Sequence, residues 1–124
     1  MNTIREIIIH NPKCLSHYLG KLLPLLIEHS KNDDEQIRHI VAENIGRLFV
    51  YYSHDMINTL EQSFKSPNTF ERATIVKSFK YAGSKETETM PLEICFEHLV
   101  KIVQDKDLNV KRYALESLTS IIHS

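Results

Sequence analysis

Apolar residues recur at three- and four-residue steps along this sequence, in short segments that are separated by turns. Between residues 35 and 52, for example, Ile37, Val41, Ile45 and Leu48 place an apolar stripe on one face of a helix. No segment has the strict apolar and polar alternation that indicates a half-buried strand. With three Gly, four Pro and 42% hydrophobic residues, the composition also favours helices over a loop-rich design. The sequence therefore predicts an all-α fold.

Prolines, a glycine and short polar runs indicate where these helices begin and end. Pro12 lacks a backbone donor and disfavours helix in the residue before it. Ser66 as a cap with Pro67 in the first turn is a start signal, and Gly83 is a stop signal. We therefore expect helices over roughly 3–10, 15–29, 35–52, 53–64, 66–83, 91–104 and 108–123.

Some single positions carry further expectations. Pro24 stands in the middle of an apolar run, residues 22–26, so it should bend that helix, and the run should be covered on several sides. Asn44 falls at the polar edge of the stripe in its helix. Phe70 falls within the apolar stripe of the helix that follows Pro67.

Similar groups of residues return at a period of about 33 to 40 residues, which is typical of stacked helix pairs. The groups are Ile37-Arg38 with Val41-Ala42, Phe70-Glu71-Arg72 with Ile75-Val76, and Val110-Lys111-Arg112 with Ala114-Leu115. Each unit reads as an apolar first helix, a polar turn and an amphipathic second helix, which is the layout of HEAT repeats. We therefore expect a HEAT-repeat α-solenoid (α-α superhelix) of three antiparallel helix pairs plus one leading helix. Its divisions are 1–11 as the trailing helix of a preceding repeat, and 12–52, 53–83 and 84–124 as repeats.

Two expectations about stacking follow from this layout. The basic residue in the first turn of each second helix should reach the turn acid of the same or the adjacent repeat, which would fix the stacking. Both ends lack the polar cap of a terminal repeat, so apolar residues there should contact further repeats. These residues are Ile4, Ile7 and Ile8 at one end and Leu118 and Ile122 at the other.

Charge and cysteine content limit the classes of partner. The net charge is −1 with cations spread along the chain, which provides no broad positive field for a nucleic acid. Two cysteines without a secretory signal indicate a reducing compartment, the cytoplasm and nucleus. The longest apolar run, residues 22–27, is far shorter than the ~20 residues of a membrane span. We therefore expect a protein partner, with no nucleic acid and no membrane.

Several patterns resemble sites for metals or catalysis without meeting their requirements. Residues 105–116 match a calcium loop at six places, but Val110 occupies the place that requires Gly, so a helix cap is favoured. His10, Cys14 and His17 have zinc-ligand spacing that is interrupted by a proline, and Cys95 with His98 offers only two ligands. No nucleophile elbow or phosphate loop occurs. We expect no catalytic residue, no metal and no cofactor.

The repeat motifs also carry a family resemblance. Arg38-His39-Ile40-Val41-Ala42-Glu43, Gly46-Arg47-Leu48, Phe70-Glu71-Arg72 and Asp107-Leu108-Asn109-Val110-Lys111-Arg112 with Ala114-Leu115 resemble the cullin-associated, neddylation-dissociated (CAND) proteins, and the likeness is to part of their C-terminal third. Lys106 and Tyr113 depart from the family pattern. The resemblance implies a non-catalytic scaffold that binds a cullin or cullin-RING complex beside adjacent HEAT repeats. It further implies regulation of the assembly and substrate-receptor exchange of cullin-RING (SCF-type) ubiquitin ligases.

Second helices usually line the concave side of such solenoids, so their exposed polar residues are the candidate contacts. These candidates are His39, Glu43, Arg47, Lys77, Lys80, Arg112 and Glu116. The alternative is that they form surface salt bridges, since the four-residue steps suit pairs within one helix. Two other functions stay open: a HEAT adaptor of another kind, such as a nuclear transport receptor or phosphatase scaffold, and a nucleic-acid-binding HEAT protein with a basic stripe.

Overall fold

The computed structural model describes residues 17–83 and 92–123, which form helices joined by turns, with no strand in these two ranges. The expected leading helix with Ile4, Ile7 and Ile8, and the side chain of Ile122, lie outside what is described. The five helices are α2 (Leu19–His29), α3 (Glu35–Phe64), α4 (Thr69–Gly83), α5 (Leu92–Ile102) and α6 (Leu108–His123). The prediction of an all-α fold is confirmed.

A kink divides α3 into two parts. Tyr52 has non-helical backbone angles, φ −128° and ψ 33°, in the middle of an otherwise continuous helix. The predicted change of helix at this residue is therefore confirmed, although no loop separates the two parts. The helices then form three consecutive pairs: α2 with the first part of α3, the second part of α3 with α4, and α5 with α6.

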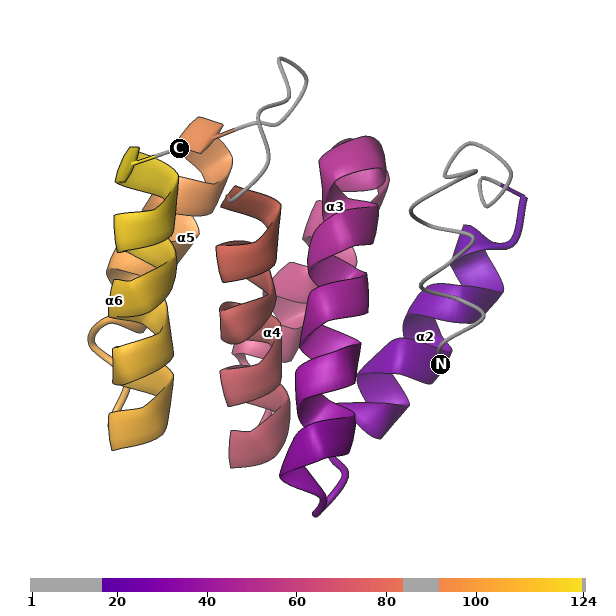
Figure 1. Ribbon diagram of the computed structural model, residues 1–124, viewed down its shortest axis with the longest axis horizontal. Coiled ribbons are helices and arrows are strands. Elements are labelled where there is room, and N and C mark those ends of the chain that lie inside the picture. Colours follow the sequence, from indigo (N-terminus) through magenta and orange to yellow (C-terminus); the bar gives the residue numbers. More distant parts are fainter. Residues whose placement is uncertain (1–16, 84–91, 124) are drawn as a thin grey trace.

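The second helix of each pair belongs to one layer. Figure 1 shows the first part of α3, then α4 and α6, side by side and running in the same direction, with α5 and the second part of α3 behind them. α4 packs against α3 on one side and against α6 on the other. We call these three segments the second-helix layer. This arrangement is that of a HEAT-like solenoid segment.

The core lies between this layer and the first helices. Phe49 and Phe79 are almost fully buried, and their rings meet edge to face at a centroid distance of 5.2 Å. Phe64, at the end of α3, lies 5.6 Å from the other side of Phe79. Aromatic contacts of this kind stabilise a core beyond the area that they bury. Phe79 of α4 is thus held between the two parts of α3.

Each second helix begins with the same turn. Asp34, Asn68 and Asp107 are the N-caps, and their side-chain oxygens accept hydrogen bonds from backbone N–H groups of the first turn at 2.9 to 3.1 Å. Two residues earlier, the side chains of Asn32, Ser66 and Asp105 accept from the N–H of the cap itself. The expected cap at Ser66, with Pro67 in the first turn, is wrong by two residues because the Asn68 amide oxygen reaches the helix instead.

Counting from these caps gives the register of the repeat and corrects two expectations. Phe70 lies two residues after its N-cap, as the exposed Gln36 and Asn109 do after theirs. Phe70 is itself 41% exposed, so it does not belong to the core. Asn44 corresponds to Ser78 and Ser117, and all three are buried. Asn44 is therefore not at a polar edge, and its two side-chain polar atoms have no hydrogen-bond partner among the described residues.

The apolar run of residues 22–26 in α2 is less buried than its apolar composition predicts. α2 continues through Pro24, and Leu23 and Leu26 are buried against α3. Leu25, on the opposite side, is 51% exposed. Among the described residues, α2 meets the core on one side, so they do not supply the cover on several sides that was expected.

The expected contact between a basic residue of each second helix and a turn acid occurs in one of the three repeats. The Nε atom of Arg72 lies 3.0 Å from Oδ2 of Asp105, the turn acid of the next repeat, and its Nη1 donates to the carbonyl of Ser66 in its own turn. Arg38 donates to the backbone carbonyls of Asn32 and Asp33 in its own turn, and no ion pair joins it to a described turn acid. Counted from the N-cap, Lys111 of α6 corresponds to Arg38 and Arg72. Arg112 therefore takes a different position, on the outer face.

The register also identifies an unfinished packing surface at α6. Ala42 and Val76 are fully buried, because the next second helix packs on each, as the bond from Ser117 Oγ to the Val76 carbonyl (2.9 Å) illustrates. Leu115 takes the corresponding position on α6 and is 53% exposed. Leu118, which was expected to contact a further repeat, is partly buried against the core of this chain. Leu115 is thus an apolar position of the second-helix layer that the described helices leave exposed.

We expect Arg72→Gln to lower the free energy of unfolding by about 1.5–3 kcal/mol, as for other hydrogen bonds to charged groups. Both partner side chains are less than one fifth exposed, so solvent screens this pair little. Urea denaturation measures the effect. Arg38→Gln, which loses two exposed turn hydrogen bonds and the contact with the Phe70 ring but no ion pair, is the matched control and should cost less. If both variants lose the same free energy of unfolding, the bond between Arg72 and Asp105 does not stabilise the fold more than the turn contacts do.

Leu115→Gln should leave the free energy of unfolding within about 0.5 kcal/mol of the parent value, because its side chain is largely exposed. It should also reduce self-association in sedimentation experiments, since it removes an apolar contact surface. Val76→Gln, at the corresponding buried position, should instead unfold the chain at much lower urea. Similar destabilisation by both changes would contradict the assigned register.

Candidate protein-binding face

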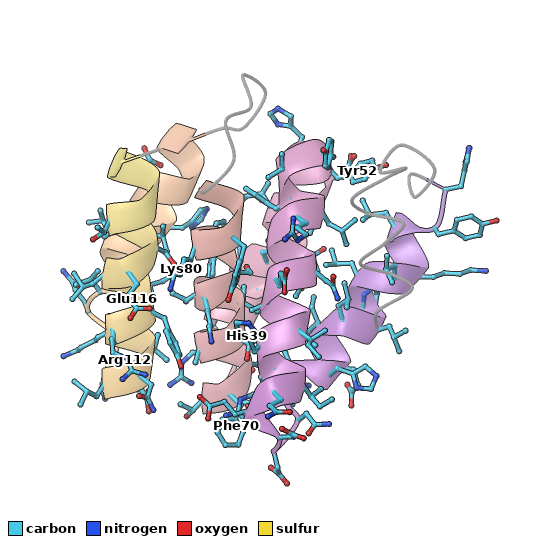
Figure 2. The ribbon with its side chains drawn as sticks, viewed as in Figure 1. His39, Tyr52, Phe70, Lys80, Arg112 and Glu116 are labelled. Carbon is cyan, nitrogen blue, oxygen red and sulfur yellow. The ribbon has the colours of Figure 1, made fainter. Side chains whose placement is uncertain are left out.

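The seven predicted contact residues all lie on the second-helix layer. His39, Glu43 and Arg47 belong to α3, Lys77 and Lys80 to α4, and Arg112 and Glu116 to α6. Figure 2 shows His39, Lys80, Arg112 and Glu116 on the near side of this layer. We call this side the second-helix face. The structure thus brings residues from three repeats together on one surface, while their role in binding stays a prediction.

Four of the seven form ion pairs with one another. Arg47 Nη2 lies 2.9 Å from Glu43 Oε1 within α3, at the four-residue spacing that suits helical pairs. Lys80 Nζ lies 3.9 Å from Glu116 Oε2 and connects α4 with α6. The alternative interpretation, that these residues form surface salt bridges, is therefore correct for both pairs. The Lys80–Glu116 pair is exposed and therefore weak, so it can exchange for a partner's charges, whereas the Arg47 and Glu43 side chains are only 20% and 17% exposed and are held more firmly.

His39 has a partner on the neighbouring helix that sequence reasoning missed. The Tyr81 hydroxyl lies 3.1 Å from Nδ1 of His39, and the two rings meet edge to face at 5.6 Å. Burial, and then the carboxylates of Glu43 and Glu116, raise the pKa of Tyr81 above its usual 10.0. The contact thus joins α3 to α4 on the second-helix face.

The remaining two candidates share an aromatic partner. Lys77 Nζ and Arg112 Cζ each lie 5.1 Å from the centre of the Tyr113 ring. A similar contact occurs beside α3, where the Arg38 guanidinium lies 4.1 Å from the centre of the Phe70 ring. Cations bind the faces of aromatic rings through the ring quadrupole. The only sequence signal for Tyr113 was its departure from the family pattern, and Phe70 had been assigned to the core.

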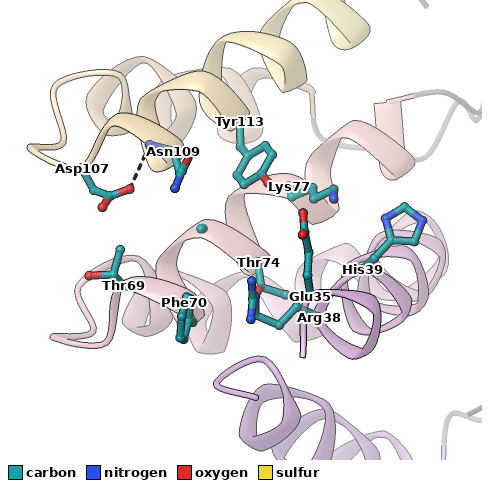
Figure 3. Close-up of a pocket in the computed structure, with 11 residues that line it drawn as sticks. Glu35, Arg38, His39, Thr69, Phe70, Thr74, Lys77, Asp107, Asn109 and Tyr113 are labelled. Carbon is teal, nitrogen blue, oxygen red and sulfur yellow. Dashed lines mark hydrogen bonds between the residues drawn. The ribbon is translucent and has the colours of Figure 1, made fainter. Parts of the chain in front are cut away.

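A cavity of about 160 Å³ lies between these two aromatic contacts (Figure 3). It runs across the first turns of the second helices and is lined by Glu35, Arg38, His39, Thr69, Phe70, Ala73, Thr74, Lys77, Asp107, Asn109 and Tyr113. Two of the seven predicted residues, His39 and Lys77, line it. A wider cavity of about 340 Å³ opens between the second part of α3 and α5, and no predicted contact residue lines it.

The acidic residues near α6 form a helix cap. The carboxylate of Asp107 accepts from two backbone N–H groups of α6, and Asp105 binds the Asp107 N–H and Arg72. This confirms the preference for a cap over a calcium loop. Among the side chains that the structure describes, which do not include that of Cys95, no three His, Cys, Asp or Glu residues are grouped as a metal site requires. Within residues 17–83 and 92–123, each helix is too short or too polar to cross a bilayer.

Comparison with known proteins identifies relatives along the whole chain. It is 34% identical over 132 aligned positions to cullin-associated NEDD8-dissociated protein 1 of Dictyostelium discoideum, covering 100% of this chain and 11% of that protein. The protein of the same name from Arabidopsis thaliana is 26% identical, covering 99% of this chain and 11% of the relative. Cullin-associated NEDD8-dissociated protein 2 of Mus musculus is 24% identical over 91% of this chain and 9% of its own length.

The chain thus spans about a tenth of the length of the curated relatives that it matches. No protein-family model matches the sequence. No solved structure is significantly similar to it either. The resemblance to the cullin-associated family that the repeat motifs indicated is confirmed by these relatives.

We expect the protein to lose stability above pH 10 through Tyr81. Because the pKa of Tyr81 is raised in the fold, the folded chain holds this proton more tightly than the unfolded chain does. The stabilisation is complete below pH 10.0 and is lost as the pH rises toward the folded pKa. Urea midpoints at pH 9 and pH 11 should therefore differ less in Tyr81→Phe than in the parent chain.

Tyr51→Phe, at an exposed tyrosine of α3, is the matched control for this measurement. It should retain the loss of stability seen in the parent chain. A Tyr81→Phe variant whose midpoints fall as steeply as those of the parent would contradict the assignment.

Proposed function

We propose that this chain, which is homologous over its length to a segment of the cullin-associated NEDD8-dissociated proteins, is a non-catalytic part of a cullin-binding scaffold. The observation that carries the proposal is the match of the whole chain to relatives that are named for their association with cullins. The fold is compatible with this role. A helical-repeat layer presents one continuous outer face that a protein partner can contact at several repeats.

The segment would supply only a share of the full binding surface. It corresponds to about a tenth of the length of its relatives, and affinity in a solenoid is distributed over many repeats. The exposed Leu115 supports packing of a further helix pair beside α6. Adjacent repeats of the same protein are thus one partner of this segment, and the cullin is the other.

The finer proposal is that the complete protein regulates the assembly and substrate-receptor exchange of cullin-RING ubiquitin ligases in the cytoplasm and nucleus. Such regulation requires no chemical step from these residues. A surface that prefers the cullin without its ubiquitin-like modifier and without its adaptor shifts the population toward that form, by as much as its affinities for the two forms differ. Paired charges on the second-helix face are suited to binding of this kind.

The test is capture of a cullin-RING pair by the complete protein that contains this segment, with and without the ubiquitin-like modifier on the cullin. We expect strong capture of the unmodified pair and weak capture of the modified pair. Equal capture of both forms would contradict the exchange function while leaving cullin binding intact. Capture of a nuclear-import cargo or a phosphatase subunit, with no capture of either cullin form, would favour an adaptor of another kind.

A further inference from the structure

The cavity on the second-helix face is flanked by two aromatic rings, and cationic side chains lie against both of them. Phe70, from the first turn of α4, is 41% exposed and has the Arg38 guanidinium over its face. Tyr113, from α6, lies between Lys77 and Arg112. Figure 3 shows Phe70 and Tyr113 on different sides of the same hollow, with Arg38 and Lys77 directed along it. The hollow therefore combines exposed aromatic surface with two cations in its lining, Arg38 and Lys77, and a third, Arg112, beside Tyr113 at its rim.

These three cations differ from the other cations of the face in how they are held. Arg47 and Lys80 are paired with carboxylates, at 2.9 and 3.9 Å. No carboxylate among the described residues lies within ion-pair distance of Arg38, Lys77 or Arg112. A ring face attracts a cation but does not neutralise its charge. Arg112 Nη2 donates to the Tyr113 hydroxyl at 3.5 Å, and its other N–H groups, the Lys77 ammonium and part of the Arg38 guanidinium stay available to an acidic partner.

The acids at the cavity compensate this positive charge only in part, and both are engaged at helix starts. Asp107 lines the cavity, but its carboxylate accepts two backbone N–H groups at the start of α6. Glu35 lies in the first turn of α3, where the positive end of the helix favours a carboxylate. Arg38 donates both of its turn hydrogen bonds through Nη1, which leaves its other donors for a ligand. The lining holds two cations, Arg38 and Lys77, and two carboxylates, Glu35 and Asp107; with Arg112 beside Tyr113 at the rim, three cations stand against two acids, a formal charge of +1 in a chain whose net charge is −1.

We propose that this cavity and its rim bind a short acidic segment of the partner protein, with an apolar or aromatic side chain of that segment against Phe70. Carboxylates of the segment would pair with Lys77, Arg112 and the free donors of Arg38, as charge complementarity across an interface requires. The inference rests on the proposed function, because it assigns the segment to the cullin-containing partner. It goes further by stating which surface binds and what chemistry it recognises.

The same face argues against a nucleic acid as the ligand. Glu35, Glu43 and Glu116 are distributed along it, and each would repel a continuous run of phosphates. A peptide can place single carboxylates beside Arg38, Lys77 and Arg112 and avoid these acids. Separate cations interleaved with acids therefore favour a protein segment with a few carboxylates over a polyanion.

The first test is fluorescence anisotropy of a labelled decapeptide of glutamate and phenylalanine with the 124-residue chain. The same peptide with glutamine in place of glutamate is the control ligand. We expect the acidic peptide to bind, the glutamine peptide to bind much more weakly, and added salt to weaken the acidic complex. Lys77→Gln combined with Arg112→Gln should weaken binding about tenfold, as the loss of two exposed charge contacts predicts.

Lys101→Gln combined with Lys106→Gln is the matched variant, because it removes the same charge at exposed positions outside the cavity. It should bind the acidic peptide as the parent chain does. The proposal is overturned if the cavity pair and the control pair bind alike. It is also overturned if a labelled thymidine decanucleotide binds more tightly than the peptide and depends on Lys77 and Arg112.

The second test introduces each of the two double variants into the complete protein and measures capture of the unmodified cullin-RING pair. Weaker capture by the cavity pair, with normal capture by the control pair, supports the inference. Equal capture by both variants overturns it and leaves the proposed function standing. If the parent protein captures no cullin, the proposed function fails, and the peptide measurement still decides whether the cavity binds acidic segments.

Discussion

The packing of one second helix against the next is the contact on which the rest of this structure depends. Val41 and Ile75 are fully buried in the two repeats, and the corresponding Ala114 is fully buried at the end of the described layer. Each of these positions lies the same number of residues after its N-cap. The three helices are therefore aligned with one another in the same way. Side chains on the outer face are then brought into lateral contact, although their positions in sequence are far apart.

The turns set this register. Asp34, Asn68 and Asp107 each start a second helix at a defined residue, and Asn32, Ser66 and Asp105 fix the backbone before them. Contacts between turns extend the order from one repeat to the next. Arg72 binds the turn of the following repeat, and Lys31 lies 3.5 Å from the largely buried Glu71 carboxylate. A sliding movement of one helix along its neighbour would break these bonds, so the face is presented in one arrangement.

Much of the fold could be predicted from the sequence because helix periodicity is a local signal. The stripe from Ile37 to Leu48 and the change of helix at Tyr52 can be found within one segment. Phe70 and Asn44 were placed wrongly because their burial depends on the register between helices, which no single stripe contains. Asn44 has a polar side chain, yet it occupies a position that neighbouring helices enclose. The same limit applies to the face: the charged residues could be named, but the aromatic partners Tyr81 and Tyr113 come from neighbouring helices.

The repeat itself explains why its binding surface resists prediction. Positions that face the next helix must be small or apolar in every unit, as Ala42 and Val76 are, so they create the periodic signal. Positions on the outer face carry no such constraint: His39, Ala73 and Arg112 share one place in the repeat, and they have nothing in common chemically. The outer face can therefore diverge while the stack is kept. What a segment of this solenoid recognises depends on combinations of residues across repeats, such as Lys77 and Arg112 around Tyr113, which only the packed layer assembles.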